Sequence, residues 1–506
     1  MQYYNPIIKG FYPDPSICKD KDTYYMVCSS FQYFPGVPLF ESKDLINWNQ
    51  IGNVLTSKKQ LHLAGAGSNG GIYAPTIRFH NGRFYMVTTN VAFGHFYVWT
   101  DDIYGTWSEP IWVDQKGIDP SLYFEENKTY FMSNGQDEQG NGAVIQCEID
   151  IETGEKLSSE QIIWHGTGGR YLESPHLYRI GAYYYLLAAE GGTEYGHMVV
   201  YARGNTPFGP FESYKQNPVL TNRNLGGYTI QGCGHGDLIQ DHNKNWWMVH
   251  LAFRQMERWQ PYHHLGREVC LMPVTFDKEG WFCVGEQGIT TIAVQTDRIS
   301  NQVKQIPLQS YDFKAKNWHN EWCHIRNPYM EHYEVGIGYL KLKGTEISLD
   351  DKNDSPTFLG LRQREMHGRV CVCIESNDGE AGITIYMDEN HHYDFAVRKT
   401  EHGTELIKRR CIGDMKYIQQ KMPLDTTALK LEICFSNEIY SFTAYTETKT
   451  LELGSALVKY LSTEVAGGFT GVMIGLYAQY QKECQNNVFF TDFICEYEQN
   501  DDIEIL

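Results

Sequence analysis

The feature that most constrains this fold is a short pattern that occurs five times in the first half of the chain. Each copy has a residue that is usually polar, a proline in most copies, a small residue and an aliphatic anchor, with two adjacent aromatic residues seven to nine positions after the anchor. The anchors lie 60, 45, 55 and 61 residues apart, at Ile17, Ile77, Leu122, Leu177 and Leu238. Internal repetition of this kind is typical of propellers, solenoids and arrays. Five copies predict five blades around one axis.

The residues just before each anchor carry the candidate chemistry. Asp14, Asp119 and His235 stand three residues before their anchors, and Glu173 stands four residues before its own. Corresponding positions of propeller blades gather around the central axis, so three carboxylates and one imidazole are predicted to converge there. A single Asp-Pro is most often only a turn former, so the prediction depends on the repetition. Converging acids without a nucleophile triad or a nucleotide-binding loop indicate glycoside hydrolysis.

Composition limits the partners of the chain and its location. The chain has 62 acidic and 43 basic residues, and a net charge of −19 argues against a nucleic acid or an anionic membrane as partner. No apolar run approaches the roughly 18–20 residues that a membrane span needs, and the first residues do not resemble a signal peptide. We therefore expect a cytoplasmic protein. Its 13 cysteines are scattered without a CxxC pair, so we expect reduced, mostly buried thiols.

The two halves of the chain differ in pattern. Up to about residue 295, short strand-like runs alternate with turn residues, and no sustained helical period occurs. Residues 297–318 form a polar stretch that we interpret as a connector. Beyond it the repeat is lost, but alternating strands continue, as in a β-sandwich. The predicted fold class is all-β: a five-bladed β-propeller over 1–296, then a β-sandwich over 319–506. The sandwich is expected to stabilise the molecule or to lend a loop to the mouth of the propeller's pocket.

Several motifs resemble those of glycoside hydrolase family 43. They include Phe11-Tyr12-Pro13-Asp14-Pro15-Ser16, Gly117-Ile118-Asp119-Pro120-Ser121, Glu173-Ser174-Pro175-His176, Gly191-Gly192-Thr193-Glu194-Tyr195-Gly196-His197 and Leu265-Gly266-Arg267-Glu268. The C-terminal part, including Gly468-Phe469-Thr470-Gly471, is similar to the concanavalin-like sandwich of the family's β-xylosidase and α-L-arabinofuranosidase branches. The resemblance covers nearly the whole chain. It implies inverting removal of terminal β-D-xylose or α-L-arabinofuranose from short xylo- or arabino-oligosaccharides.

The resemblance also implies a role for each acid. Asp14 matches the general base that activates water, and Glu173 matches the general acid that protonates the glycosidic oxygen. Asp119 matches the carboxylate that orients the acid and raises its pKa by like-charge proximity. Inverting hydrolysis predicts roughly 6.5–9.5 Å between the base and acid carboxyl groups, which leaves room for the water.

Four further residues match positions that contact the sugar. Arg267 matches an arginine that holds sugar hydroxyls in the innermost subsite, and Phe31 and Tyr73 match the rings that wall it. Thr193 is expected either to line the pocket or to have a structural role only. Tyr73 stands where the β-xylosidase branch commonly has tryptophan, so xylose and arabinofuranose both remain open.

His235 has two interpretations. In the family, a histidine here lies near a buried water or cation, sometimes calcium, beneath the site. Calcium prefers oxygen ligands, so His235 would be a minor ligand among waters. The alternative is a hydrogen-bonded axial histidine without metal. No cofactor is expected to be required.

Other titratable residues near these motifs are rival candidates. Glu190 and Glu194 flank a Gly-Gly turn and could be mistaken for the proton donor, but both lie outside the repeat position. His263 and His264 are expected to order the loop before Arg267, because adjacent residues of a strand point to opposite faces.

Two other functions fit a propeller of this kind. An endo-arabinanase would need an open groove, whereas an attached sandwich that closes one end favours a pocket and exo action. A non-catalytic sugar-binding propeller would be expected to lack at least one of the three acids. Relatives often form dimers or tetramers, so the sequence leaves a homo-oligomer open.

Overall fold

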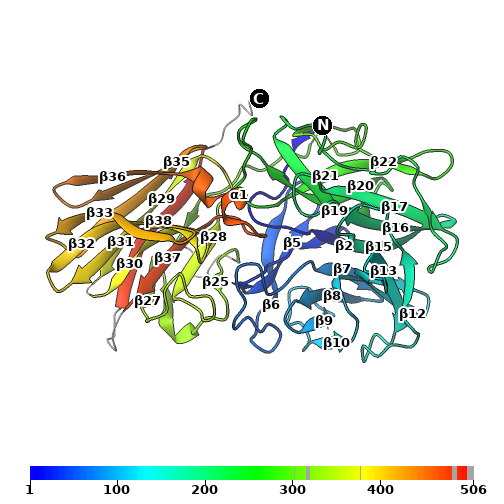
Figure 1. Cartoon of the computed structure of the whole chain (residues 1–506), viewed down its shortest axis with the longest axis horizontal. Helices are drawn as coiled ribbons and strands as arrows, with labels where there is room; N and C mark the ends of the chain where they lie inside the picture. The colour runs from blue at the N-terminus through cyan, green and yellow to red at the C-terminus, as the bar shows by residue number, and fades with distance from the viewer. Residues whose placement is uncertain (301, 315–319, 377, 481–486, 499–506) are drawn as a thin grey trace.

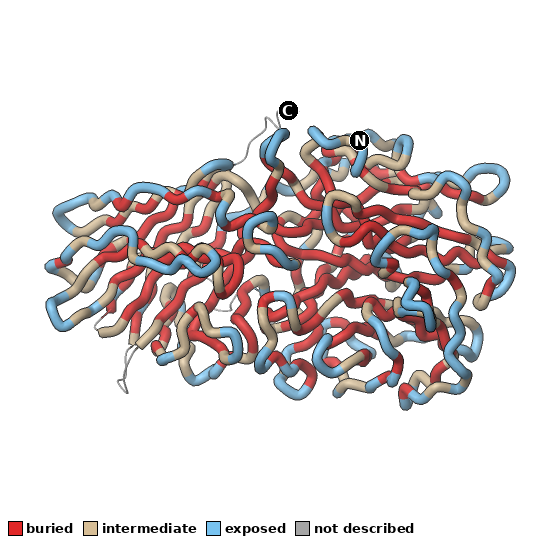
Figure 2. Tube along the Cα trace, viewed as in Figure 1, coloured by how far each residue is buried: buried red, intermediate tan, exposed pale blue. Residues whose placement is uncertain are grey.

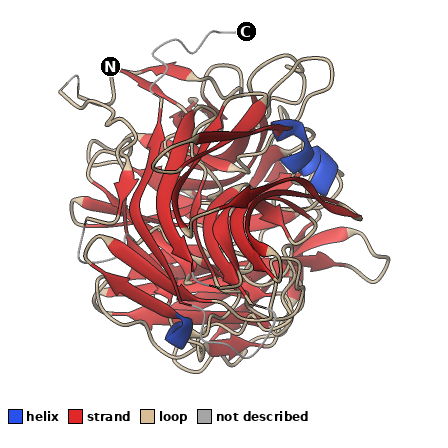
Figure 3. Cartoon of the chain, turned by 90° about the vertical axis from the view of Figure 1, so that its left-hand side faces the viewer, coloured by secondary structure: helices blue, strands red, loops and turns tan. Residues whose placement is uncertain are grey.

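The computed structural model describes residues 1–300, 302–314, 320–376, 378–480 and 487–498, and its regular structure is almost entirely β-strand (Figure 3). The propeller lies on the right of Figure 1 and the sandwich on the left, with the short helix α1 (Thr463–Ala466) between them. The other helical turns of the described chain are η1 (Met330–His332) and η2 (Val458–Leu461). The all-β prediction is confirmed.

Five four-stranded antiparallel sheets form the blades, and each blade is one contiguous stretch of chain. In chain order the strands are β2 (Ser16–Asp20), β3 (Thr23–Val27), β5 (Gly36–Ser42) and β6 (Asn49–Leu55) in blade 1; β7 (Thr76–His80), β8 (Arg83–Asn90), β9 (Gly94–Thr100) and β10 (Ile111–Val113) in blade 2; β11 (Ile118–Glu125), β12 (Lys128–Gln136), β13 (Gly142–Ile149) and β14 (Gln161–Trp164) in blade 3; β15 (Glu173–Ile180), β16 (Tyr183–Glu190), β17 (Met198–Gly204) and β18 (Glu212–Ser213) in blade 4; and β19 (Ile230–Gln240), β20 (Trp246–Arg254), β21 (Glu268–Phe276) and β22 (Phe282–Val284) in blade 5.

The five copies of the repeat occupy the same place in each blade. Every anchor lies on the first strand of its blade, and every aromatic pair lies on the second strand. The first strands contact their neighbours in a ring around the axis. All five anchors are buried, so the pattern records the apolar packing at the centre of each blade. The prediction of five blades is confirmed.

The two ends of the propeller meet outside the blades. Strand β1 (Gln2–Tyr4) pairs antiparallel with β23 (Ala293–Gln295), and the amino group of Met1 donates to the carbonyl oxygen of Thr296 at 2.6 Å. Among the described strands, none from one end of the chain completes a blade at the other end.

The sandwich consists of two antiparallel sheets that enclose a continuous buried core (Figure 2). One sheet contains β24 (Tyr311–Asp312), β26 (Tyr333–Gly336), β27 (Tyr339–Lys343), β29 (Gly368–Ser376), β34 (Ala428–Phe435), β35 (Ile439–Tyr445), β36 (Thr450–Leu457) and β38 (Asn487–Tyr497). The other contains β28 (Phe358–Arg362), β30 (Glu380–Asp388), β31 (His391–Thr400), β32 (Gly403–Ile412), β33 (Met415–Leu424) and β37 (Met473–Gln479). Several of these strands were not predicted individually, among them β33, which is a largely exposed edge strand without apolar alternation.

The two parts are joined by strand pairing and by the stretch between them. Strand β25 (His324–Ile325) pairs with β4 (Tyr33–Phe34) of the propeller, and β24 pairs with β38. Strand β24 therefore lies within the expected connector and belongs to a sandwich sheet. Residues 301 and 315–318 of that connector lie outside the described residues. The division at 296 and 318 stays a prediction.

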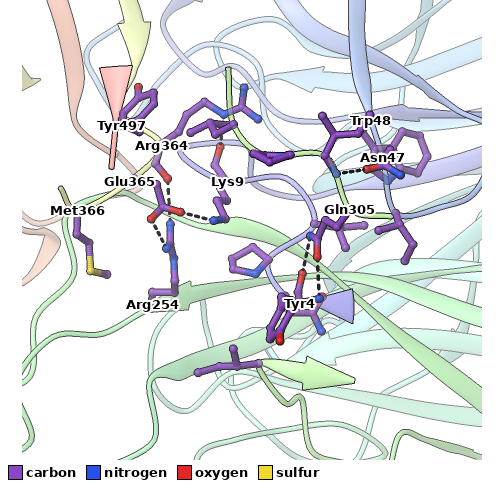
Figure 4. Close-up of a pocket in the computed structure, with 18 of the residues that line it drawn as sticks. Tyr4, Lys9, Asn47, Trp48, Arg254, Gln305, Arg364, Glu365, Met366 and Tyr497 are labelled. Carbon is purple, nitrogen blue, oxygen red and sulfur yellow. Dashed lines mark hydrogen bonds and ion pairs between the residues drawn. The ribbon is translucent and has the colours of Figure 1, made fainter. Parts of the chain in front are cut away.

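A cavity of about 1750 Å³ lies between the N-terminal segment, blade 5, the connector and the sandwich (Figure 4). Arg254 crosses this junction: it binds Glu268 of the propeller through two nitrogens at 2.8 Å and Glu365 of the sandwich at 2.7 Å. Glu365 also pairs with Lys9. The cavity lining does not include Asp14, Asp119 or Glu173, so this junction is distinct from the predicted site.

Candidate active site

The backbone at the head of each first strand explains the offset of Glu173 in the repeat. Asp14, Asp119, Ser174 and His235 have φ of 57°, 53°, 56° and 50°, in the left-handed region. Each of them stands three residues before its anchor. Asp and His are among the residues that enter this region most readily. In blade 4 the left-handed position is Ser174, so the acid stands one residue earlier.

The structure brings the predicted acids and His235 together at the axis. One ligand atom each from Asp119, Glu173 and His235 lie within 4.8 Å of one another. Asp14 Oδ1 lies 3.7 Å from Nδ1 of His235. Asp14, Asp119 and His235 are buried, and Glu173 is partly exposed. The geometric convergence predicted from the repeat is therefore present.

Asp14 is held as a carboxylate. Arg267 Nη1 donates to its Oδ1 at 2.8 Å, and the Ser29 hydroxyl donates to its Oδ2. Burial raises the pKa of Asp14, but the charges of Arg267 and His235 and the Ser29 hydrogen bond outweigh it, so the pKa lies below its ordinary value. An ionised Asp14 can accept a proton.

Asp119 has the opposite shift. Burial, followed by the negative charges of Glu173 and Asp14, raises its pKa well above the ordinary value, against one hydrogen bond from the Ser174 amide at 3.2 Å. Two carboxyl groups this close cannot easily both ionise, so the surroundings of Asp119 favour its protonated form. The site therefore combines Asp14, which is held ionised, with Asp119, whose pKa is raised.

His197 is a site residue that the sequence reasoning did not identify. It is fully buried, and its Nε2 lies 3.0 Å from Oε1 of Glu173. It stands outside the repeat position, in the loop that follows β16. The only signal for it was its place in the motif at 191–197.

Arg267 is positioned to serve both Asp14 and a ligand. Its Nη1 donates to Asp14 and to the Thr193 hydroxyl at 3.0 Å. Its Nη2 is buried and has no hydrogen-bond partner among the described residues. A buried guanidinium nitrogen without a partner is costly, so this donor is available to a ligand oxygen. Thr193 is thus brought into the site through Arg267.

Aromatic rings line the site beside Arg267, and one comes from the sandwich. Phe31 lies 5.2 Å from Tyr73 and 5.9 Å from Phe469, measured between ring centroids. The guanidinium of Arg267 lies over both Phe31 and Phe469. The Phe469 amide donates to the Asn69 side chain at 2.8 Å, which fixes its loop against the propeller. The sequence left open whether a loop of the sandwich reaches the mouth, and it named Phe469 only within the motif at 468–471.

The rival acids have structural partners. Glu190 is fully buried and accepts from the amides of Thr167 and Gly169 and from the Thr167 hydroxyl. Glu194 forms an exposed ion pair with Arg170.

The histidine pair before Arg267 also has structural contacts. His263 stacks on Phe253 with centroids 3.8 Å apart, and it binds Glu464 of helix α1 at 2.8 Å. His264 Nε2 lies 3.4 Å from the side-chain nitrogen of Gln363. These contacts join the loop before Arg267 to the sandwich.

A second polar cluster fills the axis next to the acids. Asp237, two residues after His235, is fully buried and accepts from Ser16 at 2.6 Å, from Arg78 at 2.8 and 3.2 Å, and from Tyr178. These residues come from the first strands of blades 5, 1, 2 and 4. A bound arginine therefore already supplies a positive charge to this part of the channel.

The groups around His235 do not resemble a calcium cage. Ca²⁺ takes six to eight oxygen ligands. Among the described residues, the cluster around His235 offers one imidazole and the carboxylates of Asp119 and Glu173, both of which belong to the candidate catalytic set. These protein ligands alone do not form a calcium cage, and a calcium ion held mainly by waters near His235 stays a prediction, so the proposed reaction passes through no metal.

Comparisons with known proteins agree with this geometry. Residues 3–282 match the family model described as "Glycosyl hydrolases family 43", and residues 310–496 match "Beta xylosidase C-terminal Concanavalin A-like domain". A non-reducing end α-L-arabinofuranosidase of Bacteroides ovatus is 38% identical, over 96% of this chain and 93% of that protein. A xylosidase/arabinosidase of Butyrivibrio fibrisolvens is 34% identical, over 96% and 97%.

The solved structures show the same architecture. The structure described as "Bacteroides ovatus Xyloglucan PUL GH43B" superposes with a TM-score of 0.92 and 35% sequence identity, over 98% of this chain and 100% of that one. The family model covers more than half of the chain, and similarity to relatives extends over both the propeller and the sandwich. The chain is a glycoside hydrolase that belongs to family 43.

Proposed function

We propose that this hydrolase removes terminal α-L-arabinofuranose or β-D-xylose from the non-reducing ends of short arabino- or xylo-oligosaccharides, with inversion. The observation that carries the proposal is the convergence of three acids with different partners at one site. Asp14 is bound by Arg267, which lowers its pKa, and Glu173 lies beside Asp119 and His235. Inverting hydrolysis needs one carboxylate as base and one carboxylic acid as proton donor.

In the proposed reaction, Asp14 is the base and Glu173 the acid. Asp14 accepts a proton from a water molecule as the water oxygen attacks the anomeric carbon. Glu173 donates its proton to the glycosidic oxygen as the bond from that oxygen to the anomeric carbon breaks. The products are a free sugar of inverted configuration and a shortened oligosaccharide. Asp14 then loses its proton to solvent and Glu173 regains one.

The remaining residues are proposed to bind and position. Asp119 orients Glu173, and when Glu173 carries the proton of this close pair, the charge of Asp119 favours its retention until transfer. The free Nη2 of Arg267 donates to a sugar hydroxyl. Phe31 and Tyr73 present apolar area to the sugar ring, and Phe469 narrows the mouth from the sandwich side. His235 is proposed to help position the carboxyl groups of Asp14, Asp119 and Glu173, and no metal is assigned to it.

The choice between the two sugars favours arabinofuranose. The relative named as an α-L-arabinofuranosidase has the higher identity of the two relatives described above. Tyr73 stands where the β-xylosidase branch commonly has tryptophan. It therefore provides a phenol instead of an indole at the wall of the sugar pocket. The Tyr73 hydroxyl donates to the Asn69 carbonyl, so its ring is held in place.

The test is an assay with p-nitrophenyl α-L-arabinofuranoside, p-nitrophenyl β-D-xylopyranoside and short natural oligosaccharides. Asp14→Ala should lower kcat by about 10²–10⁴-fold on all of them. Glu173→Ala should lose less activity on the p-nitrophenyl substrates, because p-nitrophenol leaves with little help from an acid. Glu194→Gln, at the exposed rival acid, is the matched control and should retain activity. Full activity in both alanine variants would refute the proposed roles.

An endo-acting arabinanase is the alternative within the same chemistry. The contact of Phe469 and Asn69 places the sandwich loop against the ring-lined wall, which favours a mouth for chain ends. Product analysis on linear arabinan separates the two: monosaccharide from the first turnover supports exo action, and mixed oligomers support the alternative.

We further propose the cytoplasm as the location, with imported oligosaccharides as substrates. Within the described residues no helix has the length and apolar character to cross a membrane. Cell fractionation with an activity assay tests the location.

A further inference from the structure

The sandwich contains a cluster of metal-type ligands that the reaction does not use. Asp350, His392 and Cys411 each offer one ligand atom, and these atoms lie within 4.8 Å of one another. His392 and Cys411 are buried, and Asp350 is partly exposed. We propose that this cluster is a zinc site that ties the loop between β27 and β28 to the six-stranded sheet.

The sheet itself places two of the ligands side by side. His392 on β31 is directly opposite Cys411 on β32, and Cys411 is opposite Lys416 on β33. Opposed residues of antiparallel strands share one face. Asp350 covers this row from the loop: its Oδ1 lies 2.9 Å from His392 Nε2 and 3.8 Å from Cys411 Sγ. Three separate segments therefore contribute one nitrogen, one sulfur and one oxygen.

These ligand types and separations suit zinc. Zinc bonds of about 2.0–2.1 Å to nitrogen and oxygen and about 2.3 Å to sulfur place tetrahedral ligand atoms roughly 3.3–3.6 Å apart. The separations here are 2.9 Å between oxygen and nitrogen and 3.8 Å between oxygen and sulfur, each within a few tenths of an ångström of that range. A thiolate and an imidazole disfavour calcium and magnesium. A water or the Asn390 carbonyl oxygen, which lies 3.3 Å from Cys411 Sγ, would complete the set.

Outer partners already hold two of the ligands in orientation. Asp394 accepts from Nδ1 of His392 at 2.8 Å, which directs Nε2 toward Asp350. Arg409 in turn donates to Asp394 at 2.9 Å. Lys416 pairs with Oδ2 of Asp350 and leaves Oδ1 facing the cluster. Carboxylates bound to the far nitrogen of a histidine are typical of metal sites, where they fix the ring and the tautomer.

The charge of the cluster allows a divalent ion to enter. Without metal, His392 lies between the carboxylates of Asp350 and Asp394, which only accept, so both of its nitrogens carry protons. Zinc would displace one proton from His392 and one from the Cys411 thiol. The two positive charges of the zinc ion replace those of the two displaced protons, so the net charge of the cluster does not change. The usual penalty for adding charge to a protein interior is therefore avoided.

The loop that zinc would fix also supports the wall of the active site. Arg326 donates to the carbonyl oxygens of Asp351 and Asp354 in this loop and to that of Ala66 in the propeller. Three residues after Ala66, Asn69 holds both Tyr73 and Phe469. A metal at Asp350 would thus stabilise the contact between sandwich and propeller beside the mouth.

Cobalt substitution tests the site directly. The full chain is stripped of metal, kept reduced and titrated with Co²⁺. We expect a thiolate-to-cobalt charge-transfer band that saturates at one cobalt per chain. Calorimetric titration with Zn²⁺ in buffers of different ionisation enthalpy should show two protons released per zinc. Asp394→Asn should weaken zinc binding by about 10–100-fold.

Matched variants decide whether the band belongs to this cluster. Cys411→Ser should abolish it, and Cys283→Ser, at an exposed thiol of blade 5, should keep it. No charge-transfer band in the wild-type chain, or a band that survives in Cys411→Ser, overturns the proposal. If circular dichroism shows that Cys411→Ser does not fold, Asp350→Asn replaces it, and an unchanged zinc affinity in that variant also overturns the proposal.

Discussion

At the scale of single residues, the site separates two carboxylates by their surroundings. Asp14 has a guanidinium and a hydroxyl beside it, and Asp119 has other carboxylates beside it. Both are buried, so burial alone would have shifted their pKa values in the same direction. The neighbouring charged and hydrogen-bonding groups, and not the degree of burial, therefore decide which of the two acids is ionised.

The first residue-scale prediction concerns Arg267 and the acid limb of the pH–rate profile. Asp14 must be ionised, so activity is lost as pH falls through its lowered pKa. Arg267→Met removes the positive charge and should move the acid limb of kcat/KM upward by about 1–3 pH units, besides raising KM. Thr193→Val, which removes only the hydroxyl partner of Arg267, should leave the limb in place. An unmoved limb in Arg267→Met would contradict this account of Asp14.

A second residue-scale effect is expected at His197, whose Nε2 lies 3.0 Å from Oε1 of Glu173. Among the described residues this nitrogen has no hydrogen-bond partner, so we expect the imidazole to position Glu173 by close packing. His197→Phe should therefore lower kcat on natural oligosaccharides, which need the proton from Glu173, more than kcat on the p-nitrophenyl substrates. His197→Gln, which keeps a polar side chain here, should restore part of the loss. Equal losses on both kinds of substrate would show that His197 is only structural.

Residues differ in how far the sequence could reveal them. The three acids Asp14, Asp119 and Glu173 could be predicted because equivalent positions of the first strand in each blade lie around the propeller axis. Phe469 and His197 lie in matched motifs but could not be assigned to the site, because they reach it through loops whose path depends on tertiary packing. Cys411 lay in the sequence without a paired cysteine motif, since its neighbours come from other segments.

At the scale of elements, the turn before blade 2 positions the wall of the site. Phe31 and Ile72 exchange backbone hydrogen bonds at 2.8 and 3.1 Å, and Gly71 lies beside them with φ of 84°. A Cβ on Gly71 would lie 2.2 Å from the Phe31 carbonyl oxygen. The close approach of two chains therefore requires glycine here.

Gly71→Ala should separate the backbone segments of Phe31 and Ile72 and displace the Phe31 ring. We therefore expect KM to rise at least tenfold and the melting temperature to fall. Gly82→Ala is the matched control: its φ is 83°, but a Cβ there meets no atom within 4 Å. It should lose only about 1–2 kcal/mol from the left-handed backbone and keep its KM. Equal kinetic effects in the two variants would rule out the steric explanation.

The β-strand character and the approximate positions of the blade strands were largely predictable from the sequence. The edge strands and the strand pairs that join the two domains were not. The first two strands of each blade follow from buried anchors and aromatic pairs. The exposed strand β33 carries no such signal, and the pairing of β4 with β25 joins residues about 290 positions apart. Such contacts depend on the assembled domains, because no local pattern selects the partner strand.

At the scale of the whole molecule, Glu365 links the two domains. Burial raises its pKa, but Arg254 and Lys9 outweigh burial and lower it from 4.5 to about 2. A lowered carboxyl pKa contributes stability that is complete above about 4.5 and is lost as pH falls toward 2. The shift corresponds to about 3 kcal/mol.

Glu365→Gln should therefore lower the free energy of unfolding near pH 7 by an amount that shrinks as pH approaches 2. Urea unfolding at several pH values measures this. Glu334→Gln, at an exposed pair with Lys341, is the control and should change little at any pH. A Glu365→Gln difference that is independent of pH would show that the charge of Glu365 does not stabilise the junction.

The contiguity of the blades has a mechanical consequence. Chain connections link each blade to the next from 1 to 5, whereas blades 5 and 1 meet through non-covalent contacts. These include the β1–β23 pair, the bonds of Ile7 and Ile8 with Val269, and Asp237, which accepts from Ser16 and the Ile17 amide. Met1 and Thr296 are neighbours in that antiparallel pair. Tension applied between them would unzip β1 from β23 one rung at a time. The load would then reach the backbone hydrogen bonds of Asn5 with Ile292 and of Ile7 and Ile8 with Val269 on β21. The segment before blade 1 would therefore peel from blade 5 before the contacts of Asp237 at the axis carried the load.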